Sequence, residues 1–165
     1  MKHEGGEKLT NIAGDKGGWT KWGITLDTWL KAGSDEDGDG DIDLEDLKLS
    51  TIEDAERIAK KKYWDPIKGD LINSQSVAEF MFDWGYNSGP SVPVKKVQAI
   101  LGTTVDGEIG PKTLALLNAT PAKTLFDKLK ASREAFYKAI VANNPSQVKF
   151  LKGWLNRNNS FIFKS

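Results

Sequence analysis

The sequence lacks cysteine altogether, which excludes disulfide bonds, thiolate metal sites and a cysteine nucleophile. It also lacks long hydrophobic runs: no stretch approaches the roughly 18 apolar residues that a membrane-spanning helix needs. The opening residues, Met1–Glu4, do not have the pattern of a secretory leader. Internal repeats, low-complexity tracts and Pro-rich or Gly/Ser-rich linkers are absent too. We therefore expect one cooperative folded unit without a membrane span, whose export route the sequence does not encode.

Net charge is also lacking, because 23 basic and 23 acidic side chains cancel. The distribution is nevertheless uneven: residues 35–46 contain eight acids and no base, so the rest of the chain carries 23 bases against 15 acids. Such a basic body is compatible with an anionic polymer as partner. Since the lysines are spread over several predicted helices and are not massed in one run, nucleic acid is not the expected polymer.

Aromatic residues are abundant, with seven Phe, six Trp and three Tyr, and they supply enough bulky apolar surface for a real core. Residues 10–25 are rich in Gly and Thr and predict a short irregular hairpin, after which Thr25 caps a helix that ends at Gly33. Helical spacing of apolar residues predicts most of the remainder as helix, so the expected fold is mainly α with a small β-hairpin corner. Helix start and stop signals include a Ser50/Glu53 capping box, Asp65-Pro66, Asn87–Pro90, Gly110-Pro111, Thr120-Pro121 and Asn143–Pro145.

The acidic segment has the pattern of an EF-hand calcium loop. In that twelve-residue loop, oxygen ligands occupy positions 1, 3, 5, 7, 9 and 12, and glycine occupies position 6. Residues 35–46 place Gly40 at position 6 and Asp46 at position 12. Carboxylates this close repel one another unless a divalent cation lies among them, so we expect an inserted loop that binds structural Ca²⁺. The alternative is a solvated acidic loop without an ion. The predicted ligands are Asp35, Asp37, Asp39, Asp41, Asp43 and Asp46.

A second pattern lies near the start of the chain, where Glu4 precedes two glycines. Asp15, a Gly17-Gly18 pair and Thr20 follow on the predicted hairpin. Glycines here would let carboxylates and backbone approach a bulky substrate closely. Taken alone this evidence is weak, because an isolated glutamate is usually a solvated surface group. His3 is the only histidine, and without a partner it favours a neighbour of the site over a general base.

The string His-Glu-Gly-Gly at residues 3–6, followed by Asp-x-Gly-Gly-x-Thr-x-x-Gly-Ile-Thr at 15–25, resembles glycoside hydrolase family 108, the bacterial and phage N-acetylmuramidases. Residues 55–66 and 82–90 are similar to later motifs of the same family. The predicted peptidoglycan-binding region that usually follows in this family is similar to residues 98–101, 105–113 and 153–157. The resemblance covers nearly the whole chain, and it implies a lysozyme-like α+β fold.

The resemblance also implies roles for individual residues. Glu4, in the Glu-Gly-Gly motif, would be the catalytic general acid, and a looser similarity to phage-type lysozymes adds Asp15 and Thr20. These two would hold a water, or Asp15 would stabilise the oxocarbenium charge directly. Inversion needs carboxyl groups roughly 6.5–9.5 Å apart and retention about 5–5.5 Å, so both mechanisms stay open. The expected substrate-binding residues are Trp19, Trp22, Asp83, Tyr86 and Asn87.

The resemblance divides the chain into a lysozyme-like catalytic region at residues 1–90, which includes the calcium loop at 35–46, and a helical peptidoglycan-binding region at 91–165 packed with it as one unit. The implied activity is cleavage of the β-1,4 bond between N-acetylmuramic acid and N-acetylglucosamine in peptidoglycan, in the periplasm or outside the cell, as by an endolysin. We expect a monomer whose partner is the glycan strand. The alternatives are a non-catalytic peptidoglycan-binding module and a calcium-dependent interaction module.

Overall fold

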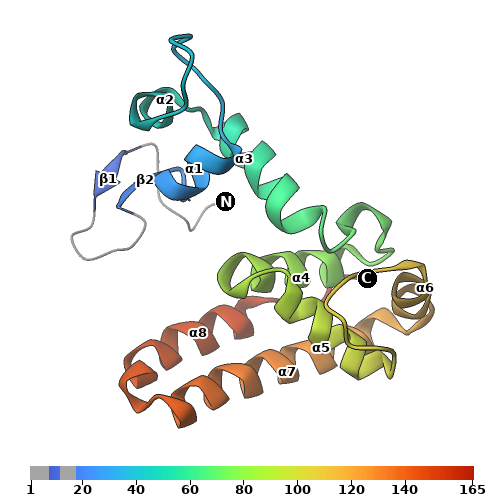
Figure 1. Ribbon diagram of the computed structural model, residues 1–165. Helices are drawn as coiled ribbons and strands as arrows, with labels where there is room; N and C mark the ends of the chain where they lie inside the picture. The colour runs from blue at the N-terminus through green and yellow to red at the C-terminus, as the bar shows by residue number, and fades with distance from the viewer. Residues whose placement is uncertain (1–7, 12–17) are drawn as a thin grey trace. The chain divides into compact units, whose positions relative to one another are not determined.

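The computed structural model describes residues 8–11 and 18–165 (Figure 1). The chain forms two compact units that meet in sequence at Lys61 and Lys62, and each unit is described by itself. Helices account for most of the described residues, and a three-stranded antiparallel sheet lies in the first unit. The expected mainly helical fold with a small β corner is therefore confirmed.

The sheet consists, in spatial order, of β1 (Thr10–Asn11), β2 (Trp19–Lys21) and β3 (Ile24–Thr25). Lys21 pairs with Ile24, which leaves Trp22 and Gly23 as a two-residue turn between β2 and β3. Both turn residues have positive φ, 55° for Trp22 and 79° for Gly23, as in a type I′ hairpin turn. Glycine adopts such angles freely, whereas a tryptophan needs support from its surroundings to stay there.

Three helices complete the first unit: α1 (Leu26–Ala32), α2 (Leu44–Leu49) and α3 (Ile52–Ala59). Thr25 caps α1 by accepting a hydrogen bond from the Thr28 amide, and α1 ends at Gly33, as the sequence predicts. Apolar side chains from the hairpin and all three helices form the core of this unit. Its buried members are Ile24, Trp29, Leu47, Ala55 and Ile58.

The capping box expected at Ser50 and Glu53 is wrong by one residue. Thr51 and Asp54 form the box that starts α3, with each side chain bonded to the backbone of the other. Ser50 instead ends α2, where its hydroxyl donates to the Leu47 carbonyl. Both pairs fit the sequence rule for a capping box. Thr51 forms the box because Ser50 is the C-terminal cap of the preceding helix.

All regular secondary structure of the second unit is helical. A π-helix, η1 (Lys60–Trp64), directly continues α3 along the chain. The helices that follow it are η2 (Gly69–Leu71), α4 (Gln75–Ser88), α5 (Ser91–Leu101), α6 (Pro111–Ala119), α7 (Ala122–Asn143), η3 (Pro145–Gln147) and α8 (Val148–Ser160). Several boundaries follow local signals in the sequence. The C-terminal cap of α4 is Gly89, with φ of 89°, and proline occupies the first position of α6.

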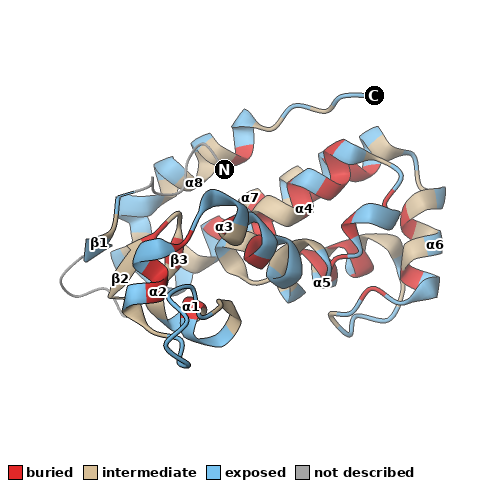
Figure 2. Cartoon of the chain, turned by 90° about the horizontal axis from the view of Figure 1, so that it is seen from above, coloured by how far each residue is buried: buried red, intermediate tan, exposed pale blue. Residues whose placement is uncertain are grey.

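The core of the second unit forms where α4, α5 and α7 pack against one another (Figure 2). Phe80 of α4 is central, because its ring makes edge-on contacts with Trp84, Phe126 and Phe161 at centroid distances of 5.3–6.3 Å. Edge-to-face packing of this kind adds to the free energy gained from burying the apolar surface. None of the helices among residues 8–11 and 18–165 combines the length and apolar character needed to cross a membrane.

Candidate active site

Two of the three predicted catalytic residues, Glu4 and Asp15, lie outside the described residues, as does His3. The third, Thr20, lies in the middle strand of the sheet, where it pairs with Thr10 of β1 and Thr25 of β3. The Thr10 hydroxyl also donates to the Thr20 carbonyl at 3.4 Å. Hydrogen bonding on both sides fixes the backbone of Thr20, so its side chain is held on a rigid element.

The hairpin that carries Thr20 is anchored to the end of α2. Lys21 is 9% exposed, and its ammonium donates to the carbonyl oxygens of Lys48 and Ser50, the latter at 2.9 Å. The Trp22 indole N–H donates to the same Ser50 carbonyl at 3.0 Å. A cation at the C-terminal end of a helix interacts favourably with the helix dipole as well. Sequence analysis missed this anchor, because it joins residues 27 to 29 positions apart.

Trp19 and Trp22, which were expected to contact substrate, both pack against the core of the first unit. Each ring is partly buried. The indole of Trp22 is also committed to Ser50, and this contact supports the positive φ of the turn. The two rings therefore have a structural function, and their contact with substrate stays a prediction.

The acidic loop between α1 and α2 brings its carboxylates together. Asp35, Asp37 and Asp39 form one group, and Asp41, Asp43 and Asp46 form a second. Within each group, oxygen atoms from all three side chains lie within 4.8 Å of one another. Gly38 and Gly40 both have positive φ, and their amides donate to the Asp35 carboxylate at 2.6 and 2.9 Å.

Asp46, at the last position of the loop, is fully buried. Its carboxylate accepts hydrogen bonds from the amides of Asp43 (2.8 Å), Glu36 (2.6 Å) and Asp37 (3.2 Å). These bonds outweigh the effect of burial and lower the pKa of Asp46, the bond from Asp43 most of all. Asp43 and Asp46 also form the capping box of α2. Two of the six acids thus stabilise the helix start irrespective of any ion.

The acids of the loop also repel one another. Asp39, together with desolvation and the charge of Asp43, raises the pKa of Asp41. A hard divalent cation prefers several carboxylate oxygens in one place and would relieve this repulsion. The donor set, the glycine at position 6 and the closeness of the oxygens therefore fit Ca²⁺.

Asp83 of α4, an expected substrate-binding residue, forms ion pairs with two arginines. Arg157 of α8 binds both of its carboxylate oxygens, with Nε at 3.1 Å from each and Nη2 at 2.5 Å from Oδ1. Nη1 of the fully buried Arg133 of α7 lies 2.9 Å from Oδ2. A carboxylate shared by two guanidinium groups is held firmly in one orientation. The arrangement gives Asp83 a structural function, and substrate contact there stays a prediction.

Arg133 is a residue that sequence analysis missed. Its guanidinium carbon lies 5.4–5.9 Å from the ring centroids of Phe80, Trp84 and Tyr137, and its Nε donates to the Tyr137 hydroxyl at 2.9 Å. Aromatic faces and a carboxylate together compensate a buried cation. The spacing of residues along α7 does not predict that Arg133 is buried among aromatic rings, since an arginine on a helix is usually exposed.

Tyr86 and Asn87, the other expected substrate-binding residues, lie at the end of α4. The Tyr86 ring is partly buried and contacts Tyr63, with ring centroids 4.8 Å apart, and Phe82, at 6.4 Å. Asn87 is exposed, and its side-chain amide donates to the Asp83 carbonyl at 2.9 Å. This bond fits the alternative that Asn87 belongs to an ordinary helix stop, and substrate contact by either residue stays a prediction.

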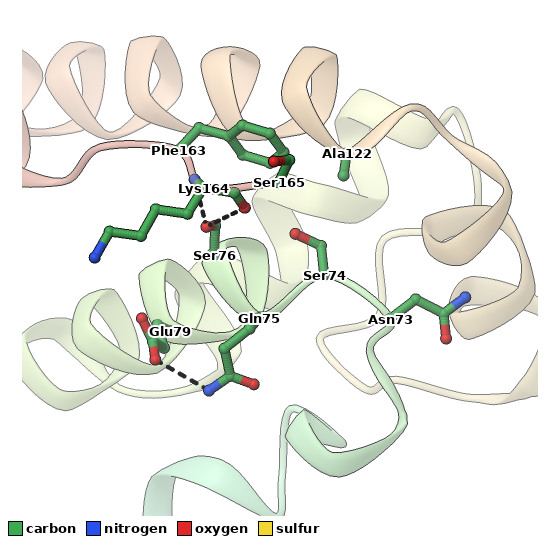
Figure 3. A pocket seen from close by; sticks show the side chains of 9 residues that line it. All are labelled: Asn73, Ser74, Gln75, Ser76, Glu79, Ala122, Phe163, Lys164 and Ser165. Atoms are coloured by element: carbon green, nitrogen blue, oxygen red, sulfur yellow. Dashed lines mark hydrogen bonds between the residues drawn. The ribbon is translucent and has the colours of Figure 1, made fainter.

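A groove of about 720 Å³ opens elsewhere on the second unit, between the start of α4 and the last residues of the chain (Figure 3). The Ser76 hydroxyl accepts from the Lys164 amide at 2.9 Å and donates to the Lys164 carbonyl at 3.0 Å, which fastens the C-terminal segment to α4. Glu79 is the one acid among the residues that line it, and it accepts from Gln75 at 3.0 Å.

Comparison with known proteins decides the family. The glycosyl hydrolase 108 family model matches residues 1–89. The chain belongs to this family. A second model, described as a predicted peptidoglycan domain, matches residues 92–159 of this glycosyl hydrolase 108 member. The chain is also similar to the solved structure of Brucella abortus SagA, with 27% identity, a TM-score of 0.68 and coverage of 97% of this chain and 89% of SagA. No curated protein matches it.

This glycosyl hydrolase is therefore an enzyme of the lysozyme type that acts on peptidoglycan as a muramidase. The observed mixture of helices with one small sheet is consistent with a lysozyme-like α+β fold. The two matched segments do not coincide with the two compact units: α4 lies in the glycosyl hydrolase segment, yet it packs with α5 and α7 of the peptidoglycan segment.

Proposed function

We propose that this muramidase uses Glu4 as its general acid, with Asp15 and Thr20 completing the site. The Glu-Gly-Gly motif within the matched segment supports this assignment. The rigid position of Thr20 on the middle strand supports it as well. Protonation of the glycosidic oxygen by Glu4 would release the leaving sugar, while Asp15 and Thr20 would hold a water or stabilise the positive charge on the other sugar. The enzyme would act in the periplasm or outside the cell, including as an endolysin.

Replacing Glu4 by Gln tests the assignment, because glutamine keeps the shape of the side chain but cannot supply the proton. Release of reducing ends from purified peptidoglycan is expected to fall by roughly 100-fold or more. Glu7→Gln is the matched control, as it removes a nearby carboxylate outside the motif. Near-wild-type release by Glu4→Gln, with an unchanged melting temperature, would remove Glu4 from the mechanism.

The configuration of the first-formed product separates the two roles open to Asp15. If the product is inverted, Asp15 and Thr20 position the attacking water, and Asp15→Ala is expected to slow the reaction more than Thr20→Ala. Another water partly replaces a hydroxyl, whereas nothing replaces a carboxylate that faces a developing positive charge. Retained configuration would make Asp15 a candidate nucleophile and would end the water-positioning role.

We further propose that residues 35–46 bind one structural Ca²⁺, with ligands from Asp35, Asp37, Asp39, Asp41, Asp43 and Asp46. The ion would affect catalysis indirectly, through the position of the hairpin that carries Thr20. The loop leads directly into α2, and the end of α2 holds Lys21 and Trp22 next to Thr20. An ion that orders the loop would therefore stabilise the hairpin that carries Thr20.

Calcium binding is tested by thermal unfolding with excess Ca²⁺ and with a chelator. An ion that binds only the folded protein raises the melting temperature by mass action. Asp39→Ala is expected to abolish that response, while Asp27→Asn, which removes an exposed carboxylate on α1, is expected to keep it. Identical melting curves of the wild type with and without Ca²⁺ would rule the site out and favour the solvated loop.

A further inference from the structure

The last part of the chain has a one-sided charge. Residues 135–165 contain five bases and no acid. Two of the bases, Lys149 and Lys152, are exposed on α8. Peptidoglycan carries carboxylates on its stem peptides, so its charge is complementary to this segment.

Three aromatic rings form a ladder that reaches the surface on α8. Tyr137 of α7 stacks on Trp154, with ring centroids 5.1 Å apart and planes inclined by 23°. Trp154 stacks in turn on Phe150, at 5.8 Å and 30°. Tyr137 is buried, whereas Phe150 is 46% exposed, and the Lys149 ammonium lies 5.1 Å from its ring centroid. The ladder thus presents an aromatic surface to solvent beside a positive charge.

Gly153 lies on the same face of α8, next to this surface. It is four residues from Lys149 and three from Phe150, so it neighbours both on the helix. A Cβ atom built at Gly153 would meet nothing within 4 Å. Internal packing therefore gives no reason for a glycine here, although glycine in a helix interior destabilises the helix by about 1 kcal/mol relative to alanine. Its absent side chain leaves bare backbone open to an approaching molecule.

We propose that Phe150, Gly153 and Trp154, with Lys149, form a platform that binds a sugar of the peptidoglycan strand. This α8 platform rests on the muramidase function and assigns a glycan-binding surface within the matched peptidoglycan region. The apolar face of the sugar ring packs on Phe150 and on the open backbone at Gly153. Lys149 binds a carboxylate of the attached stem peptide.

Binding is measured by co-sedimentation with purified peptidoglycan sacculi in a Glu4→Gln background, so that turnover does not consume the ligand. Phe150→Ala is expected to weaken binding by about fivefold or more, as the loss of an exposed aromatic anchor does at other interfaces. Val148→Ala is the matched control: Val148 is 59% exposed, and the helical spacing of two residues places it on the side of α8 opposite Phe150. Its binding is expected to equal that of the parent.

Gly153→Ala separates an effect on binding from an effect on folding, because it is expected to stabilise the fold and to weaken binding. Alanine is expected to raise the melting temperature by about 2–4 °C while weakening binding several-fold. Unchanged binding by both Phe150→Ala and Gly153→Ala would overturn the platform. So would a dependence on the lysines of α8 alone, which would indicate charge attraction to any polyanion. Hydrolysis by the wild type is measured separately: platform-dependent binding without hydrolysis would reject the muramidase assignment and keep the platform.

Discussion

Gln98 shows how one side chain can organise a loop. It is fully buried on α5, and its amide nitrogen donates to Asp106 Oδ1, the Glu108 carbonyl and Thr113 Oγ1 at 2.8–3.3 Å. Its amide oxygen accepts from the backbone of Asp106 and Gly107 at 3.1 and 3.0 Å. A single glutamine thereby bonds to Asp106, Gly107 and Glu108 of the loop between α5 and α6 and to Thr113 of α6.

Gln98→Leu is expected to destabilise the protein by about 2–4 kcal/mol, because it leaves several of these polar groups without partners at similar side-chain volume. Urea unfolding measures the loss. Gln75→Leu is the control, since Gln75 is an exposed helix glutamine that bonds only to Glu79 among the described contacts of its side chain, and a change within about 0.5 kcal/mol is expected. Equal effects of the two substitutions would contradict the role of Gln98.

Asp106 in the same loop predicts a pH dependence. Hydrogen bonds from the Glu108 amide and from Gln98 lower the pKa of Asp106 in the folded protein. Its contribution to stability is therefore fully present above the unfolded pKa of about 3.9, and it is lost as the pH falls through the folded value. The difference in melting temperature between wild type and Asp106→Asn is expected to be constant near neutral pH and to shrink below about pH 4. A difference that grows in acid would contradict the assigned direction.

At the scale of elements, the turn between β2 and β3 depends on a contact with α2. Trp22 keeps its positive φ while its indole bonds to the Ser50 carbonyl. Trp22→Phe keeps an aromatic ring and removes the donor, so it is expected to cost about 0.5–1.5 kcal/mol of stability. Muramidase activity should fall with it, because Thr20 lies on the adjoining strand.

Trp22→Gly tests which matters more for the turn, the backbone strain of the positive φ or the contact of Trp22 with α2. Glycine relieves the positive φ but loses both the ring and the hydrogen bond. If the contact with α2 matters most, Trp22→Gly is less stable and less active than Trp22→Phe. The reverse order, measured by thermal unfolding and reducing-end release, would show that backbone strain dominates this turn.

At the scale of the molecule, the second compact unit contains both α4 and the peptidoglycan region. The buried face of α4, which includes Val77, Phe80 and Trp84, packs into a core shared with α5 and α7. Asp83 of α4 also pairs with Arg133 and Arg157 of that region. Removing the peptidoglycan region would expose an apolar face and leave Asp83 without these two partners.

A chain cut after Pro90 is therefore expected to lose the cooperative unfolding of α4 and to bind a hydrophobic dye. Residues 62–165 alone, which keep this unit whole, are expected to unfold in one cooperative transition. Circular dichroism during urea titration compares the two fragments. Cooperative folding of α4 in residues 1–90 would show that the glycosyl hydrolase segment folds independently of the peptidoglycan region.

Local signals in the sequence determined much of this protein. Thr25 and Gly33 bound α1, Pro111 starts α6, and Gly89 follows α4 as expected, because caps act within one turn of helix. The motif around Glu4 and the match to the family are likewise properties of sequence. The spacing of the acids in residues 35–46 belongs to the same class of local signal.

Only the tertiary structure decided which polar groups meet across long separations. Lys21 and Trp22 reach Ser50, and Asp83 reaches Arg157 across 74 positions. Spacing along the chain carries no information about such pairs, since they depend on how whole helices pack. The same packing gives Asp83 and Trp22 structural contacts, while their contact with substrate stays a prediction. Burial also turned Arg133 from an ordinary helix residue into the centre of an aromatic cage, because a buried cation is stable only among such partners.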